Sequence, residues 1–360
     1  MTISEIAKLA GVSSATVSRY FNNGYLSDEK REAIAKVVKE TGYRPSPQAQ
    51  TLRTHRSGMV GVILPRIEST SIARVVAGIS TVMNKNKYKI MLANTENNPD
   101  TELGYMKVFD NKQVDGVIFV ATVITGKHRR MIRDSSIPIV VVGQKIDEAD
   151  CVYHDDYHAT YELTEMLINK GRKKLAYISA LKEDRAVGRE RTKGYVDAVR
   201  KHGLGDAADR IVEGDFSRES GQEAMEQLLR DCPDIDAVIS ATDTMGVGAI
   251  QALRLFGKNI PSDVMIAGIG NSPMSEVISP TLTTMNYEYE ESGRIAAQLL
   301  LDKILPGQSE DRASGSTAKD AHGAGQSSAD GSDMTCAQIL LGHRLIERES
   351  TVGSGDKQFC

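Results

Sequence analysis

The chain has 360 residues, 40% of them hydrophobic and 26% charged, which suits two or three folded domains with apolar cores. No run approaches the roughly 18 apolar residues of a membrane span, and no basic segment followed by an apolar run marks a secretory signal. Four cysteines without a C-x-x-C pair argue against a disulfide framework and a zinc site, and they favour a reducing cytoplasm. Residues 1–57 carry a balance of +4 and the rest −8, so only the N-terminal segment is expected to meet an anionic partner.

The N-terminal segment predicts four short helices. A capping box at Thr2 and Glu5 begins the first, whose apolar face is Ile6, Ala7, Leu9 and Ala10. Gly11 ends this helix, and Ser13 caps a second one that is rich in small polar side chains. A third begins after Ser27 and ends near Gly42, with Ile34, Val37 and Val38 closing a small core, and Pro47 suits the first turn of a fourth. The first two helices and their Gly-containing turn form a helix-turn-helix pattern, which is typical of binding in the DNA major groove.

The segments AKLAGVSSATVSRYFN and TGYRPSPQAQTLR resemble the head and hinge of the lactose-repressor (LacI/GalR) family of bacterial regulators. The resemblance implies a DNA-binding head and hinge helix at 1–57 and an effector-binding, dimerising body at 58–360. It places Ser14, Ala15 and Arg19 at base-reading positions, with Arg19 as a bidentate guanine ligand. It also implies phosphate contacts, for which helix capping is the alternative, by Ser4, Ser13, Thr16 and Asn22. In the hinge it implies minor-groove insertion of Ala49 and Leu52.

Beyond residue 57, short apolar runs alternate with amphipathic helical stretches. Strands are predicted at 59–64, 89–93, 116–121, 137–142, 175–179, 237–240 and 264–267, and helices at 72–86, 160–169, 188–202, 219–229 and 245–256. This alternation indicates an α/β body of two doubly wound subdomains with a cleft between them, and the resemblance implies the same periplasmic-binding-protein-like architecture. Residues 307–335 are nearly all small or polar, so we expect a disordered insertion before a last strand-like run at 336–349.

Enzyme motifs are missing from the body. There is no Walker A sequence and no G-x-S-x-G elbow, and Pro273 should obstruct the helix that a dinucleotide site needs after Gly268-Ile269-Gly270. The cluster at 154–158, HDDYH, has the spacing of metal ligands on a helix, but it lies between an apparent strand and a helix, so one regular helix is not expected there and we expect no metal. The resemblance instead places Asp155 and Asp156 at the crossover into the second subdomain, where Asp156 could cap the next helix. We therefore expect no enzyme activity and no cofactor.

The cleft implies a ligand, and the resemblance implies a sugar or related metabolite. It assigns Arg191, whose guanidinium can bind paired hydroxyls, and also Ser71, Thr242, Asp243, Tyr287 and Tyr289. Gly270 stands where relatives often carry an acidic residue, so Asn271 is the candidate for gripping ligand hydroxyls. Sucrose or another glucoside is the expected effector.

These observations predict a cytoplasmic, nucleoid-associated homodimer with no membrane association. It would repress a carbohydrate-utilisation operon by binding a palindromic DNA operator until a small sugar releases it. Two alternatives stay open: a catabolite-control-type regulator that answers to a phosphoprotein partner, and a sugar-binding enzyme with an accessory DNA-binding head.

Overall fold

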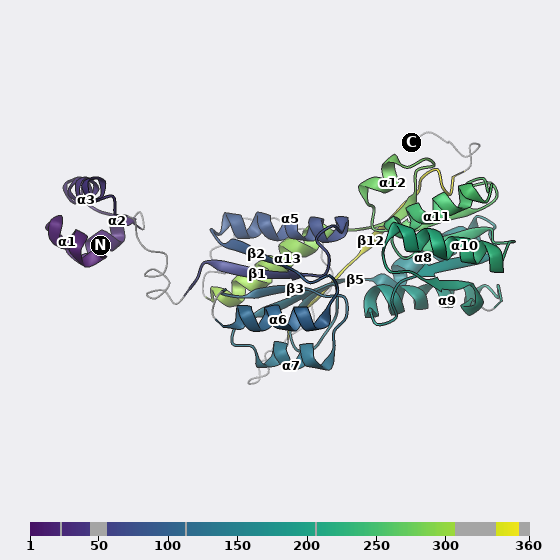
Figure 1. The fold of residues 1–360 in the computed structure, drawn as a ribbon, viewed down its shortest axis with the longest axis horizontal. Coiled ribbons are helices and arrows are strands. Elements are labelled where there is room, and N and C mark those ends of the chain that lie inside the picture. Colours follow the sequence, from purple (N-terminus) through teal and green to yellow (C-terminus); the bar gives the residue numbers. More distant parts are fainter. Residues whose placement is uncertain (22–23, 44–55, 112–113, 206, 307–335, 353–360) are drawn as a thin grey trace, which may run out of the picture. The chain divides into compact units, whose positions relative to one another are not determined.

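The computed structural model describes residues 1–21, 24–43, 56–111, 114–205, 207–306 and 336–352. The chain divides into two compact units, a head of residues Met1–Gly58 and a body of residues Met59–Cys360 (Figure 1). The hinge residues 46–53, with Ala49 and Leu52, the residue Asn22 and the insertion at 307–335 all lie outside the described residues. No helix in the described ranges has the length and apolar character needed to cross a bilayer.

The head contains α1 (Ile3–Leu9), α2 (Ser14–Phe21) and α3 (Asp28–Thr41). The predicted capping box is confirmed, because the Glu5 N–H donates to Thr2 Oγ1 and the Thr2 N–H donates to Glu5 Oε2. Gly11 and Gly42 follow α1 and α3 with positive φ angles of 66° and 64°, as helix-ending glycines do. The core is built from Ile6, Ala7, Val17, Leu26 and Ile34. Leu9 departs from the prediction, since its side chain is 60% exposed.

The body holds two sheets of six strands each, as expected for two doubly wound lobes. The first lobe has the order β11-β5-β4-β3-β1-β2, with bounds β1 (Met59–Leu64), β2 (Lys89–Asn94), β3 (Val117–Val120), β4 (Ile139–Val142), β5 (Asp150–His154) and β11 (Gln338–Leu341). The second has the order β12-β10-β9-β8-β6-β7, with bounds β6 (Leu175–Ser179), β7 (Ile211–Glu213), β8 (Ala237–Ser240), β9 (Met265–Ile269), β10 (Thr283–Tyr287) and β12 (His343–Ile346). All pairs are parallel except β10 with β12.

Helices cover both faces of each sheet, which is why the central strands β3, β4 and β8 are buried throughout and, apart from Ser240 at the end of β8, apolar. In the first lobe, α5 (Thr70–Lys85) and α13 (Tyr289–Ile304) pack on one face, and α6 (Pro99–Asp110) and α7 (Gly126–Asp134) on the other (Figure 1). The second lobe carries α8 (Asp156–Asn169), α9 (Arg191–Lys201), α10 (Arg218–Asp231), α11 (Asp243–Leu255) and the short α12 (Pro273–Val277). Pro273 is the first residue of α12, so the expectation that it obstructs a helix was wrong, because proline is tolerated in a first turn.

The chain crosses between the lobes at Asp155, at Glu288 and at Gly342, between β5 and α8, β10 and α13, and β11 and β12. The last crossing corrects the prediction of one strand at 336–349. Residues on either side of Gly342 pair with different sheets, β11 with β5 and β12 with β10. The crossings lie where the carboxyl ends of the parallel strands meet, so they form the floor of the region between the lobes.

Candidate functional site

The helix α2 turns one side toward the head core and another toward solvent. Val17 is fully buried in the head core, whereas Ser14, Ala15 and Arg19 are exposed. Ser13 caps the helix, because its hydroxyl accepts the Thr16 N–H and lies 2.8 Å from the Thr16 hydroxyl. Ser4 is exposed on α1. The three side chains expected to read bases, Ser14, Ala15 and Arg19, are thus accessible, and their individual DNA contacts stay predictions.

A cavity of about 490 Å³ lies between the two lobes of the body. Five of the predicted effector residues line it: Ser71, Arg191, Thr242, Asp243 and Tyr289. Further lining residues that the sequence did not single out include Arg66, Gln144, His154, Asp184, Phe216, Arg218 and Ser272. Tyr287 and Asn271 are absent from the lining, and their positions are described below.

Arg191 is the first residue of α9 and only 4% exposed. Its Nε donates to Asp156 Oδ1 at 2.7 Å and Nη1 donates to the Ala241 carbonyl, so the guanidinium is held rigidly at the cavity wall. The Asp156 carboxylate raises the pKa of Arg191 against the opposing effect of burial, and the arginine is therefore charged. The sequence suggested Asp156 as the cap of α8, but this prediction is wrong. The capping side chain is that of Asp155, which accepts the His158 N–H.

Tyr287 lies beneath the cavity instead of lining it. It is the last residue of β10 and has no exposed surface, and its hydroxyl donates to Asp156 Oδ1 at 3.1 Å. The Arg191 guanidinium carbon is 5.2 Å from its ring centre. Tyr287 therefore supports the Asp156–Arg191 pair from below. Tyr289 begins α13, so its side chain is free of the strand's alternation and reaches the cavity.

Thr242 and Asp243 begin α11 at the cavity wall. The Thr242 hydroxyl caps the helix by accepting the Met245 N–H. Asp243 is 2% exposed and accepts hydrogen bonds at 2.6 Å from the Ser272 N–H and from the Thr284 hydroxyl. Burial raises the pKa of Asp243, although these two donors oppose the shift. Its carboxylate ties α11 to the segment that follows β9.

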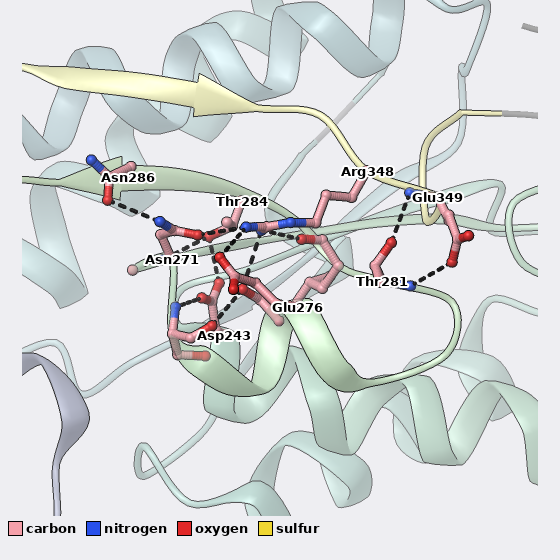
Figure 2. A network of polar contacts seen from close by, with 12 residues as sticks. Asp243, Asn271, Glu276, Thr281, Thr284, Asn286, Arg348 and Glu349 are labelled. Atoms are coloured by element: carbon pink, nitrogen blue, oxygen red, sulfur yellow. Dashed lines mark hydrogen bonds and ion pairs between the residues drawn. The ribbon is translucent and has the colours of Figure 1, made fainter. Parts of the chain in front are cut away.

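Figure 2 shows what fixes that segment. Arg348, just after β12, donates from Nη2 to Asn271 Oδ1 at 2.8 Å and to Glu276 Oε1 at 3.0 Å, and from Nη1 to the Leu282 carbonyl. Asn271 itself adopts a φ of 47° and donates from Nδ2 to Asn286 Oδ1. Asn271 thus points into this network and does not line the cavity, contrary to the expectation that it grips ligand hydroxyls.

Several contacts bridge the lobes at the cavity edge. Gln144 Nε2, from the first lobe, donates to Asp184 Oδ1 in the second at 2.8 Å. Burial raises the pKa of Asp184 to about 6. Arg74 on α5 donates to the carbonyls of Gly270 and Tyr287. No local motif could reveal these pairs, since the partners lie 40 or more positions apart.

The histidines of the 154–158 cluster have different surroundings. His154 is buried between aromatic rings, whereas His158 is exposed and pairs with Asp155 at 2.8 Å. Within the described ranges, no group of three or more His, Cys, Asp or Glu side chains is arranged to hold a metal ion.

Comparison with known families gives two matches. The family described as periplasmic binding proteins and sugar binding domain of LacI family matches residues 57–324, and bacterial regulatory proteins, lacI family, matches residues 2–46. The sucrose operon repressor of Staphylococcus xylosus is 32% identical over 84% of this chain and 93% of its own length. Catabolite control protein A of Priestia megaterium is 33% identical over 83% and 91%. A solved complex of the transcriptional regulator CelR with cellobiose superposes with a TM-score of 0.70 at 26% identity, over 97% of this chain and 99% of that one.

Proposed function

The chain belongs to the LacI family of bacterial regulatory proteins, and we propose that it is a homodimeric repressor whose bound sugar releases it from a palindromic operator. One observation carries the proposal: a head exposing Ser14, Ala15 and Arg19 on one helix precedes a body with a cavity between two lobes that is lined by both charged and apolar side chains. Bases are read by exposed polar side chains in the major groove, and two-fold protein symmetry suits a palindrome. A ligand that prefers one arrangement of the lobes can then change DNA affinity.

A neutral disaccharide suits the cavity. About 490 Å³ falls within the range of small-molecule sites and accommodates two sugar rings. Guanidinium and carboxylate groups at its wall, from Arg191 and Asp243, can exchange hydrogen bonds with hydroxyls, while Phe216 and Tyr289 offer apolar ring surface. The relatives named for sucrose and found with cellobiose favour sucrose or another glucoside.

We infer that the sugar is bound and not transformed. The three buried carboxylates in the cavity lining already accept hydrogen bonds from protein donors. Asp156 accepts from Arg191 and Tyr287, and Asp243 accepts from Ser272 and Thr284. Asp184 accepts from Gln144 and from the Val187 N–H. Such carboxylates hold the cavity wall in place, which fits a protein that binds its ligand without transforming it. As a DNA-binding regulator, it would act in the cytoplasm on the nucleoid. Dimerisation is supported by large apolar side chains left exposed on α11 and α12, with Leu255 71% and Val277 74% exposed.

The test is fluorescence anisotropy on the DNA upstream of the protein's own gene, at fixed salt, against sucrose, cellobiose, maltose, glucose, fructose and ribose. Release by one sugar would support the proposal and identify the effector. Arg19→Ala should weaken specific DNA binding by about 10- to 100-fold without changing sugar binding, whereas Lys39→Ala removes an exposed head cation and should cost far less. Arg191→Met should abolish release while DNA binding persists, measured at a temperature at which the variant is folded. Tight DNA binding that no sugar alters would instead favour the alternative left open by the sequence, a catabolite-control-type regulator that answers to a phosphoprotein partner.

A further inference from the structure

His154 has an unsatisfied polar atom at the wall of the effector cavity. It is the last residue of β5, immediately before the first crossing between the lobes, and its side chain lines the cavity. The residue is 9% exposed, and its Nε2 is buried with no hydrogen-bond partner in the protein. Leaving a buried nitrogen unpaired is costly, so such an atom beside a cavity marks a place where a ligand atom is expected.

The imidazole ring is held in one orientation by aromatic neighbours. It stacks on Tyr287 with ring centres 4.6 Å apart and 20° between the planes, and it meets the edge of Tyr289 at 5.2 Å. Tyr287 is anchored in turn by its hydrogen bond to Asp156. The direction of Nε2 is therefore fixed before any ligand arrives, as specific recognition requires.

The charge state of His154 defines the chemistry of its partner. Burial lowers the pKa of His154 to about 4, and nearby Arg191, Arg74 and His343 act in the same direction against Asp156. At neutral pH the ring is uncharged, with one nitrogen that donates and one that accepts. A hydroxyl can serve either form of Nε2, because it is both donor and acceptor.

We propose that His154 Nε2 forms a hydrogen bond with a hydroxyl of the bound sugar, which makes His154 a specificity-determining residue of the effector site. This inference rests on the proposed function and adds to it a contact that no sequence pattern indicated. Because His154 is at the end of β5, this hydrogen bond would join the sugar directly to one of the segments that connect the lobes.

Isothermal titration calorimetry with the same six sugars tests the proposal. His154→Phe keeps a ring to stack on Tyr287 but removes both nitrogens, and His154→Gln keeps an amide that can donate and accept. We expect the Kd of the sugar that binds the wild type most tightly to rise about tenfold or more in His154→Phe and within about threefold in His154→Gln. His202→Gln is the matched control, since His202 is exposed at the end of α9, where it bonds Glu165, and it should leave the Kd unchanged.

Monodeoxy derivatives of that sugar separate a direct contact from a structural effect. The derivative that lacks the hydroxyl facing His154 should bind the wild type more weakly than the parent sugar, yet bind His154→Phe as well as the parent does. Melting followed by circular dichroism, together with operator binding, establishes that each variant is folded. A folded His154→Phe variant with wild-type sugar affinity and wild-type discrimination among the deoxy sugars would overturn the histidine contact alone. A wild type that binds no sugar would overturn the contact and the proposed effector together.

Discussion

Replacing Asp156 by Asn should destabilise the body severely, although the two side chains are nearly the same size. The side chains of Asp156 and Arg191 are 7% and 5% exposed, and Asp156 Oδ1 accepts from Arg191 Nε at 2.7 Å and from the Tyr287 hydroxyl at 3.1 Å. The amide oxygen of Asn can still accept both hydrogen bonds. The change therefore isolates the loss of the negative charge, which leaves the Arg191 guanidinium buried without a counter-charge.

The expected cost is about 3–5 kcal/mol in the free energy of unfolding, the range seen when one partner of a buried ion pair is removed. Arg191→Met should cost a similar amount, because it leaves Asp156 unpaired. The double variant removes both charges and should lose less than the sum of the two, with a coupling of at least about 2 kcal/mol. Glu290→Gln breaks an exposed pair with Arg294 on α13 and should stay within about 0.5 kcal/mol of the wild type.

Urea titrations followed by far-UV circular dichroism measure these values, with the unfolding slope compared between variants to establish that the same transition is followed. A cost below about 1 kcal/mol for Asp156→Asn would refute the reasoning, since the pair would then be screened as surface pairs are. If the loss in the double variant equals the sum of the two single losses in the free energy of unfolding, the reasoning is refuted as well, because the two charges would then not stabilise each other.

Three further predictions concern stability. Because the pKa of His154 falls from 6.5 to about 4 on folding, the stability advantage of the wild type over His154→Gln should shrink by about 3 kcal/mol as the pH falls from 7 to 4; parallel urea curves would contradict this. Gly78→Ala should lower the free energy of unfolding by about 1–3 kcal/mol, since its Cβ would lie 1.9 Å from a carbonyl oxygen of α13. Gly104→Ala meets open space and should be neutral or stabilising in thermal melts. Arg348→Met should cost about 1.5–3 kcal/mol in urea titrations, and the exposed Arg344→Met much less; equal losses would show that the network in Figure 2 adds no stability.

The fold was predictable where one local signal agreed with burial. The runs at 59–64, 175–179 and 237–240 are strands with the predicted bounds, because short apolar runs bounded by turns suit sheets that are covered on both faces. The helix α6 was missed, although Asn98 caps it by accepting two backbone N–H groups and Pro99 occupies its first turn. Its weak amphipathic pattern concealed it, and the capping signal could have revealed it.

The cavity residues divide according to the kind of information that places them. Arg191 and Asp243 begin helices that follow the lobe strands, so a match to a family motif transfers their position well. For Tyr287 and Asn271, the backbone conformation at one or two residues decides whether the side chain faces the cavity. Tyr287 still belongs to β10 and points into the packed interior, and the positive φ of Asn271 directs its amide toward Asn286 and Arg348. Residue spacing cannot foresee where a strand ends or which way one residue turns.

His154 lines the cavity and also packs against side chains beside the other crossings, so a bound ligand can act on the connection between the lobes. His154, Tyr287 and His343 each adjoin a different crossing segment, and the Tyr287 ring contacts both histidine rings, at 4.6 Å and 6.5 Å between ring centres. A group that binds at His154 or Arg191 therefore touches residues whose packing depends on how the three segments lie together. A ligand shifts such an equilibrium only through contacts that differ between the two arrangements. Contacts at the crossings meet that condition, since any relative motion of the lobes must change the geometry there.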